Sequence, residues 1–328
     1  MTDAQTPLRI ALLGAGALGR VWSKVIASNG DAVLVAVVDP LVGSATTLQP
    51  APEWDGVPLA ASLAGLGEVA LDAAVITAFS PAHEAAVRGA LEHGLHVIVE
   101  KPFTTTIEAA RRLVDLAADR GLTLMVSQNY RFLPGVAAIR DLVGAGTYGE
   151  IRAVAGQFWC DWAGKPYQHA MGHVMALEMA VHHFDLVRAL FDAEPAAGTV
   201  REWDPSPPRF AGGGGLEALF EMRSPTGVFP FLYTGSLVGR AKQTPWPGLW
   251  RFEFDGATLV VDTVEGRYGL YRASPEGFEW LGPFGDEVVF GPSFAHFVES
   301  LRSGREPWSS GRDNLGTMAM ALSYTAGS

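Results

Sequence analysis

Short apolar runs alternate with amphipathic segments over the first third of the chain. The runs are rich in branched side chains and lie at residues 8–13, 32–38, 73–77, 96–100 and 122–126. Runs that are apolar on both faces are typical of a parallel sheet covered by helices. Helix signals fall between them: Ser80 and the following proline begin a segment that Gly94 ends, and a capping box at 105–108 begins another that Gly121 ends. The alternation predicts βαβ units and a doubly wound parallel sheet.

The pattern changes after residue 126. A helical segment at 134–146 is followed by a strand-like run at 151–162 and by a second helical segment around 176–187. From 198 to about 281, strand-like runs follow one another across turns rich in glycine and proline, which indicates an antiparallel sheet. We therefore expect an α/β domain at 1–126 and an α+β domain at 127–328.

Composition narrows the class of protein. Of the 328 residues, 48% are hydrophobic and 18% are charged, which fits a globular enzyme. The net charge of −11 argues against nucleic acid as the main partner. Cys160 is the single cysteine, so no intramolecular disulfide can form, which fits a reducing compartment. No signal peptide is recognised, and no run approaches the roughly 18 apolar residues of a membrane helix, so we expect a cytoplasmic protein without membrane contact.

The first chemical motif is GAGALG at 14–19, which fits G-x-G-x-x-G, follows the first strand and begins a helix. The first glycine makes the turn, the second lets the backbone approach a pyrophosphate, and the third permits close helix–strand packing. Asp39 ends the second strand, where a carboxylate can accept a ribose 2′-hydroxyl and would repel a 2′-phosphate. NAD is therefore favoured over NADP, and a glycine-rich turn without ligand is the alternative. The expected cofactor residues are Gly14, Gly16, Ala17, Leu18, Gly19 and Asp39.

The second motif is VIVEKP at 97–102, in which a buried strand ends in Glu100, Lys101 and a proline. Ligands of open α/β sheets bind at the carboxyl ends of the strands. A lysine there can hydrogen-bond a substrate hydroxyl and lower its pKa by proximity of positive charge. The alternative is an ordinary surface ion pair at a strand end.

Together and in this order, the two motifs resemble the Gfo/Idh/MocA family of oxidoreductases. The resemblance continues through SPAHEAAVRGALEHGLHVIVEKP (80–102), NYRFLPGVAAIRDLVGAGTYGEI (129–151) and EMAVHHFDLVRALF (178–191). It implies an N-terminal Rossmann domain and a C-terminal domain with a large open, mainly antiparallel sheet. Because that sheet commonly forms subunit contacts in the family, the resemblance also implies a homodimer or homotetramer.

The resemblance further implies a set of site residues. The lysine of E-K-P and a D-x-x-x-H pair carry over as the catalytic set Lys101, Glu178 and His182. On the cofactor side it implies Phe79, Ser80 and His83, with Glu100 and Lys101 near the nicotinamide, and on the substrate side Asn129 and Arg131. Two departures concern the substrate side: Glu178 stands where aspartate is usual, and residues 170–174 replace a glycine-rich turn.

Helix spacing separates the two adjacent histidines of the segment 176–187. Glu178, His182 and Asp185 are spaced i, i+4 and i+7, so they share one face, with a carboxylate on either side of His182 that could raise its basicity. His183 instead falls on an apolar stripe, which favours a packed histidine bonded to a backbone group. We therefore expect Glu178, His182 and Asp185 to face the substrate.

Two alternatives bear on these residues. Glu178, His182 and Asp185 could present one nitrogen and two carboxylates to a metal ion, but H-E-x-x-H is absent and a hydride acceptor needs no metal, so we expect none. Trp159 lies near the end of a predicted strand, where its ring could stack on a sugar. The alternative for this tryptophan is a place in the core or at a subunit interface.

These observations predict an NAD(P)-dependent oxidoreductase that acts on a hydroxyl carbon of a sugar or polyol. His182 would take the hydroxyl proton, Lys101 would polarise the hydroxyl, and Glu178 would orient His182 or bind a neighbouring hydroxyl. Three alternatives stay open: a lyase or hydrolase that uses NAD in a transient redox step, a non-catalytic dinucleotide-binding sensor, and a reductase of imines or cyclic compounds.

Overall fold

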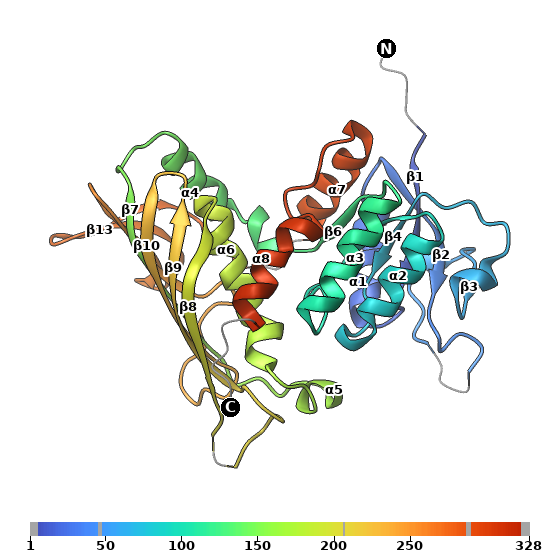
Figure 1. Cartoon of the computed structure of the whole chain (residues 1–328), viewed down its shortest axis with the longest axis horizontal. Helices are drawn as coiled ribbons and strands as arrows, with labels where there is room; N and C mark the ends of the chain where they lie inside the picture. Colours follow the sequence, from blue (N-terminus) through green and yellow to red (C-terminus); the bar gives the residue numbers. More distant parts are fainter. Residues whose placement is uncertain (1–5, 45–47, 206, 287–289, 323–328) are drawn as a thin grey trace. The chain divides into compact units, whose positions relative to one another are not determined.

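The computed structural model describes residues 6–44, 48–205, 207–286 and 290–322 (Figure 1). The chain divides into two compact units. Unit 1 comprises the chain up to Gln128 together with Phe290–Leu315, and unit 2 comprises the intervening segment from Asn129 together with the chain from Gly316. Each unit is built around one β-sheet.

Unit 1 has a six-stranded sheet in which every strand pairing is parallel. The strand order is β3-β2-β1-β4-β5-β6. The strands are β1 (Leu8–Leu13), β2 (Ala32–Val38), β3 (Leu59–Ala60), β4 (Ala73–Ile76), β5 (His96–Val99) and β6 (Leu124–Val126). The order reverses between β1 and β4, which is the topological switch point of a doubly wound sheet. The predicted fold class of this part of the chain is confirmed.

Three of the helices of unit 1, α1 (Ala17–Ala27), α2 (His83–Glu92) and α3 (Ile107–Asp119), follow the expected alternation. Helix α7 (Gly291–Ser303) comes from a segment near the end of the sequence, and the short 3₁₀ turns are η1 (Pro52–Trp54), η2 (Leu63–Leu66) and η3 (Ser80–Ala82). The capping box was expected to begin α3 at residue 105. Thr106 is the N-cap instead, because its side chain accepts the backbone N–H of Ala109 at 3.3 Å.

The segment Phe290–Leu315 belongs to unit 1, whereas the boundary predicted from the sequence assigned all of 127–328 to the second domain. Helix α7 packs on α1 and β5, and the ring of Phe294 meets Trp22 edge-on at 6.0 Å. Farther along, the hydroxyl of Ser309 donates to the carbonyl of Val126 at 2.7 Å. The assignment differs because these contacts join segments more than 180 residues apart, which no local pattern encodes.

Unit 2 has an eight-stranded sheet of order β14-β13-β12-β11-β7-β10-β9-β8. Its pairings are antiparallel except that β10 runs parallel to β7. The strands are β7 (Ile151–Trp159), β8 (Glu194–Trp203), β9 (Gly215–Ser224), β10 (Gly227–Ser236), β11 (Leu249–Phe254), β12 (Thr258–Val264), β13 (Arg267–Ser274) and β14 (Gly277–Gly282). The predicted mainly antiparallel sheet is confirmed.

The helices of unit 2 cover one face of this sheet, where Figure 1 shows α4 and α6. The helical elements are η4 (Asn129–Phe132), α4 (Pro134–Gly144), α5 (Pro166–His169), the π-helical turn η5 (Ala176–Ala180) and α6 (Val181–Phe191), while α8 (Gly311–Leu322) begins in unit 1 and ends in unit 2. Every residue of α6 is buried. Phe184 meets the rings of Phe220 and Phe231 edge-on at 5.3 and 6.0 Å, which anchors α6 on the sheet.

No helix in the described parts of the chain combines the length and the apolar character needed to cross a lipid bilayer.

Candidate functional site

The loop between β1 and α1 has the geometry that G-x-G-x-x-G predicts. Gly14 has a φ of +109°, and a Cβ there would lie 2.7 Å from the backbone nitrogen of Ala78. A Cβ on Gly19 would lie 2.1 Å from the carbonyl oxygen of Gly14. At Gly16, by contrast, no atom of the described chain lies within 4 Å of an added Cβ. The first and third glycines are therefore required by packing, and the second leaves open space next to the exposed start of α1 at Ala17.

Asp39 follows β2 and hydrogen-bonds to the backbone of this loop. Its Oδ2 accepts the backbone N–H of Ala15 at 2.8 Å, and its Oδ1 accepts that of Leu41 at 2.9 Å. A carboxylate can accept about four hydrogen bonds, so acceptor capacity remains for a ribose hydroxyl. Asp39 thus holds its negative charge beside the open loop.

The residues after β4 lie in contrasting surroundings. Phe79 exposes 55% of its surface, whereas Ser80 and His83 are buried. The ring nitrogens of His83 lie 2.7 Å from the carbonyl oxygen of Pro102 and 2.9 Å from that of Ala78. His83 was expected beside the cofactor. Its ring links two loops, the one after β4 and the one that carries E-K-P, and so holds these loops together. A contact with the cofactor stays a prediction.

Glu100 and Lys101 follow β5 at the carboxyl edge of the unit 1 sheet. Glu100 is buried, and its Oε1 accepts the indole N–H of Trp22 at 2.8 Å. Burial raises the pKa of Glu100, and the Trp22 hydrogen bond and the charge of Lys101 oppose that rise. The backbone N–H of Lys101 lies 3.3 Å from Oε2 of the same carboxyl. The E-K-P motif therefore places a buried acid directly beside a lysine.

Glu178 and His182 lie on a helix that changes its winding between them. Glu178 is in the π-helical turn η5, and His182 is the second residue of α6. The i, i+4 spacing assumed a uniform α-helix, and a π turn rotates the residues before it relative to those after it. Both side chains are buried, and the His182 ring stacks on Tyr130 with centroids 4.4 Å apart and planes 16° apart.

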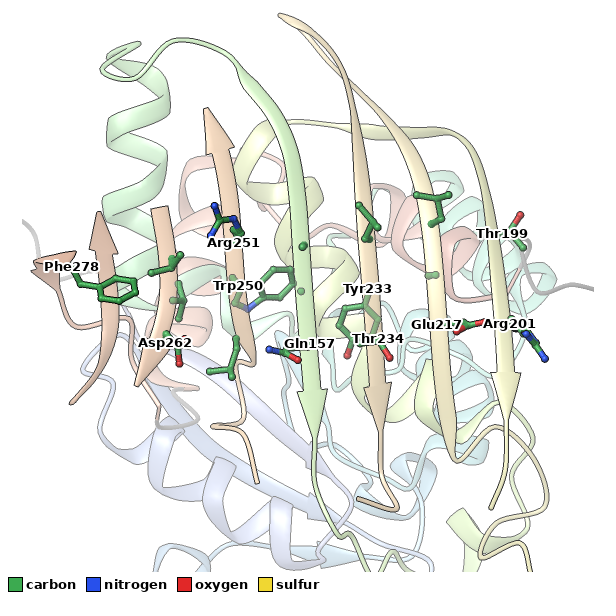
Figure 2. A pocket seen from close by; sticks show the side chains of 18 residues that line it. Gln157, Thr199, Arg201, Glu217, Tyr233, Thr234, Trp250, Arg251, Asp262 and Phe278 are labelled. Atoms are coloured by element: carbon green, nitrogen blue, oxygen red, sulfur yellow. Dashed lines mark hydrogen bonds and ion pairs between the residues drawn. The ribbon is translucent and has the colours of Figure 1, made fainter. Parts of the chain in front are cut away.

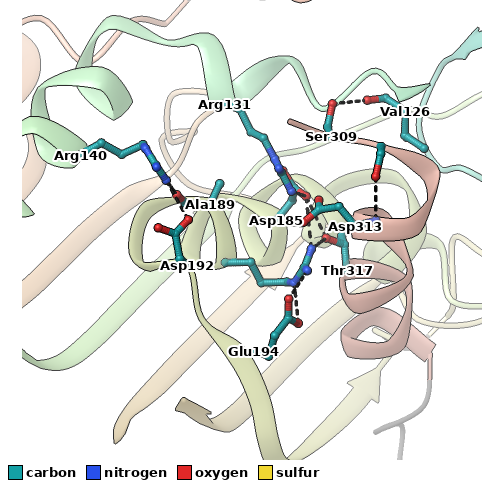
Figure 3. Close-up of polar contacts among 12 residues, drawn as sticks. Val126, Arg131, Arg140, Asp185, Ala189, Asp192, Glu194, Ser309, Asp313 and Thr317 are labelled. Carbon is teal, nitrogen blue, oxygen red and sulfur yellow. Dashed lines mark hydrogen bonds and ion pairs between the residues drawn. The ribbon is translucent and has the colours of Figure 1, made fainter. Parts of the chain in front are cut away.

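Arg131 and Asp185 form a buried ion pair in unit 2, shown in Figure 3. The guanidinium Nε and Nη2 each lie 2.7 Å from a carboxylate oxygen of Asp185. The Thr317 hydroxyl donates to the same carboxylate at 2.8 Å, and Arg188 donates to Thr317 at 2.8 Å and to Glu194. The sequence predicted Asp185 and Arg131 as substrate-facing residues, with Asp185 flanking His182. The observed contacts tie η4, α6 and α8 together, and a contact of these two residues with the substrate stays a prediction.

His183 is a core residue, as its place on the apolar stripe predicted. Its Nε2 lies 3.2 Å from the carbonyl oxygen of Trp246, and its Nδ1 lies 2.6 Å from the hydroxyl of Tyr233. Because a carbonyl only accepts, Nε2 carries the proton and Nδ1 accepts from Tyr233. Burial lowers the pKa of His183 to about 3, so the ring is neutral.

The remaining predicted residues are spread over unit 2. Asn129 is buried at the start of η4. Trp159 ends β7 and is partly exposed, and its backbone N–H donates to the hydroxyl of Thr244 at 3.0 Å. Within the residues that the structure describes, no three His, Cys, Asp or Glu side chains come together in a way that could hold a metal ion.

Two aromatic residues, Trp22 and Tyr130, contact predicted site residues but carry no sequence signal for it. Trp22 lies 78 positions from Glu100, and Tyr130 lies 52 positions from His182. The only local indication is their proximity to a motif, because Trp22 follows Gly19 by three residues and Tyr130 precedes Arg131. Tertiary contacts alone reveal both partners.

A broad hollow of about 870 Å³ lies across the sheet of unit 2. Figure 2 shows Gln157, Thr234 and Glu217 on neighbouring strands of this sheet. Its lining includes none of the predicted catalytic residues. The hollow is therefore a feature of the sheet surface and is separate from the residues that the motifs identify.

A glycine-rich loop on a doubly wound parallel sheet, joined in one chain to a mainly antiparallel α+β unit, defines a Rossmann-type two-domain protein. Two family models match this chain: "Oxidoreductase family, NAD-binding Rossmann fold" over residues 8–128, and "GFO/IDH/MocA C-terminal domain" over residues 136–214. The chain belongs to the Gfo/Idh/MocA family of oxidoreductases.

Known proteins similar to the chain include two from Rhizobium meliloti. The rhizopine catabolism protein MocA is 30% identical over 58% of this chain and 59% of its own length. An inositol 2-dehydrogenase is 30% identical over 58% of this chain and 57% of its own length. The matched regions thus span little more than half the length of these relatives. A D-apiose dehydrogenase from Paraburkholderia graminis is 26% identical over 76% of this chain and 69% of its own length.

Solved structures share the fold over nearly the whole chain. An oxidoreductase from Agrobacterium radiobacter, solved with NAD+, L-tartaric acid and magnesium, superposes with a TM-score of 0.83 at 20% identity, covering 96% of this chain and 94% of that one. The aldose-aldose oxidoreductase from Caulobacter crescentus gives 0.78 at 19% identity, covering 97% and 96%. At sequence identities of 19–20%, this structural similarity shows a shared fold and nothing further.

Proposed function

We propose that the protein is an NAD-dependent oxidoreductase that transfers hydride between nicotinamide and a hydroxyl carbon of a sugar or polyol. The observation that carries the proposal is the β1–α1 loop, where Gly16 leaves open space at the start of α1 and Asp39 holds a carboxylate beside it. The names of the relatives, which include an inositol and a D-apiose dehydrogenase, support the substrate class.

The residues of the loop fit a dinucleotide. Backbone N–H groups at the start of α1 would bind the pyrophosphate, and Asp39 would accept a ribose hydroxyl. Its negative charge would repel a 2′-phosphate, which supports NAD over NADP. When bound, the nicotinamide supplies a two-electron acceptor or donor for hydride. We place Phe79, the exposed aromatic ring after β4, among the groups that contact this cofactor.

For the chemistry on the hydroxyl we assign roles to three residues. His182 takes the hydroxyl proton in the oxidative direction, and its stacking on Tyr130 fixes the plane of the ring. Lys101 donates a hydrogen bond to the hydroxyl oxygen and stabilises the negative charge that develops there. Glu178 orients His182 or binds a neighbouring hydroxyl of the substrate.

The test is a panel of sugars and polyols, inositols and pentoses included, incubated with NAD and separately with NADP while reduced cofactor is followed at 340 nm. The expected result is NADH formation with at least one member of the panel and a higher kcat/KM with NAD. Binding of NAD without NADH formation on any member would contradict the proposal. In that case, product analysis separates a lyase or hydrolase with a transient redox step from a sensor that leaves every compound unchanged.

We also propose that the protein forms a homo-oligomer in which the subunits meet through the sheet of unit 2. Its outward face exposes apolar side chains from three strands, namely Leu219, Val228, Leu232 and Phe278. Side chains of both signs lie among them, such as Arg201 and Glu217, which pair at 3.4 Å. A face that carries exposed apolar side chains together with charges of both signs suits a second copy of itself across a two-fold axis.

A further inference from the structure

The helix that begins at the glycine-rich loop is bonded to the E-K-P motif through one side chain. Trp22, on α1, is 1% exposed, and its indole N–H donates to Oε1 of Glu100 at 2.8 Å. Both atoms of this hydrogen bond are buried. It connects the element that would bind the dinucleotide phosphates to the residue next to Lys101.

The indole is held in place from its other side. The rings of Phe290 and Phe294, at the start of α7, lie 5.2 and 6.0 Å from the Trp22 ring, tilted by 43° and 85°. These ring contacts pack the buried indole against the start of α7. The N–H of Trp22 is therefore a fixed donor aimed at the carboxyl group.

A buried carboxylate depends strongly on such a donor. Burial raises the pKa of Glu100, and the Trp22 hydrogen bond is the largest contribution against that rise. The charged group that acts on Glu100 is Lys101. The segment after β6 faces Glu100 with Ser127, which does not titrate, and α2 brings His83 to the carbonyl of Pro102 in the same loop.

We propose that Trp22 is a positioning residue, whose fixed N–H favours the carboxylate form of Glu100 beside Lys101 over the protonated form. The α1 helix thus sets the electrostatic state of the E-K-P loop through one hydrogen bond. The effect on turnover rests on the proposed function, in which Lys101 acts on the substrate hydroxyl. The effect on Glu100 itself is independent of it.

The chain offers a matched control in Trp54. This residue is 5% exposed, and its indole N–H donates to the hydroxyl of Ser23, also on α1, at 2.6 Å. Trp54→Phe and Trp22→Phe therefore each remove a buried indole N–H from a partner connected with the same helix. Only Trp22→Phe removes the donor to Glu100.

The first measurement is the titration of Glu100 in the isolated full-length protein by infrared difference spectroscopy. The C=O band of the protonated carboxyl is assigned by its loss in Glu100→Gln. In Trp22→Phe we expect the titration midpoint to move to higher pH by about one to two pH units, as loss of a hydrogen bond to a charged group implies. In Trp54→Phe the midpoint should stay at the wild-type value.

A second variant separates the hydrogen bond from packing. Replacement of Trp22 by 3-benzothienylalanine keeps the bicyclic ring and substitutes sulfur for the N–H, so no cavity forms. It should raise the midpoint as Trp22→Phe does. An unchanged midpoint in this variant, or an equal shift in Trp54→Phe, would overturn the proposal.

The kinetic measurement uses the substrate found in the panel. If the carboxylate form of Glu100 is the one that supports turnover, the acidic limb of the kcat/KM profile moves to higher pH in the Trp22 variants. It stays in place in Trp54→Phe, with the Kd for NAD unchanged in both. A uniform loss of kcat at all pH values would contradict the positioning role. If wild-type protein turns over no substrate, the proposed function fails, and the infrared titration still decides the role of Trp22.

Discussion

His182 and His183 are adjacent in the chain, and their rings have different surroundings. His182 stacks on Tyr130 at the start of α6, whereas His183 lies between the hydroxyl of Tyr233 and the carbonyl of Trp246. Consecutive residues of a helix point about 100° apart, so one can face a site while the other faces the core. The base proposed here is therefore His182.

Replacement of His182 by alanine should abolish turnover while leaving the dinucleotide bound. A general base contributes about 10²- to 10⁴-fold to the rate of a proton-transfer step. We therefore expect kcat to fall by about 10²- to 10⁴-fold or more. The Kd for NADH, measured by fluorescence titration, should stay within twofold of wild type, because the loop that we propose binds it lies in unit 1. Turnover close to that of wild type would remove His182 from the mechanism.

His183 should make the stability of unit 2 depend on pH. Its pKa is lowered by burial to about 3, below the value of about 6.5 for an exposed histidine. Between these values the unfolded chain binds a proton that the native chain does not, so the free energy of unfolding falls as pH falls through this window. The slope is at most about 1.4 kcal/mol per pH unit.

Urea unfolding of wild type and His183→Gln between pH 4 and 7.5 tests this expectation. The slope should flatten in His183→Gln and stay as in wild type in His93→Gln, which changes an exposed histidine. Parallel slopes in all three proteins would show that His183 does not carry the effect.

At the scale of elements, the Arg131–Asp185 pair holds η4 against α6, and Thr317 adds α8 to the same carboxylate. Both partners have side chains that are 1% exposed. Removing Arg131 takes two charge-assisted hydrogen bonds from the buried Asp185 carboxylate and leaves it only the Thr317 hydroxyl and Arg188, which lies 3.9 Å away. Breaking such a buried pair costs more than the pair itself contributes.

Arg131→Ala should therefore lower the free energy of unfolding of unit 2 by about 3–5 kcal/mol. The matched control is Arg9→Ala in unit 1, because Arg9 also contacts Asp72 through two nitrogens but with side chains 43% and 30% exposed. That change should cost about 1 kcal/mol or less. Equal losses for the two variants in urea unfolding would contradict the structural role given to Arg131.

The elements themselves follow the sequence pattern in unit 1 more closely than in unit 2. Strands β1 and β2 have the predicted bounds, 8–13 and 32–38, because continuous apolar runs allow little freedom of placement in a buried parallel sheet. The helix predicted around 176–187 is interrupted by the π turn η5. A π turn adds one residue to a helical turn without a distinctive residue preference, so the sequence does not mark where it falls. The packing around Glu178 and His182 decides the position of η5.

At the scale of the whole molecule, the exposed face of the unit 2 sheet predicts that the protein assembles into an oligomer. Leu232→Glu places a charge at an exposed apolar position of this face, so the oligomer should dissociate to monomers in size-exclusion chromatography with light scattering. Val33→Glu, at an exposed apolar position of unit 1, should leave the assembly unchanged. A monomeric wild-type protein would contradict the proposed oligomer.

The sequence by itself determined the features that depend on neighbouring residues. The βα alternation, the glycine loop with Asp39, the E-K-P strand end and the apolar placement of His183 were all visible in local patterns. They could be predicted because periodicity and turn chemistry act over windows of roughly 11–18 residues, and because one βαβ unit fixes where the second strand ends relative to the glycine loop.

Only the tertiary structure decided the features that depend on distant partners. It paired β10 with β7 in parallel and placed Phe290–Leu315 in unit 1. It also ion-paired Asp185 with Arg131 and hydrogen-bonded Trp22 to Glu100. In each case a side chain or strand had several chemically adequate partners in the sequence. The choice among them was made by which segments the packed core brings into contact, and that is a property of the whole fold.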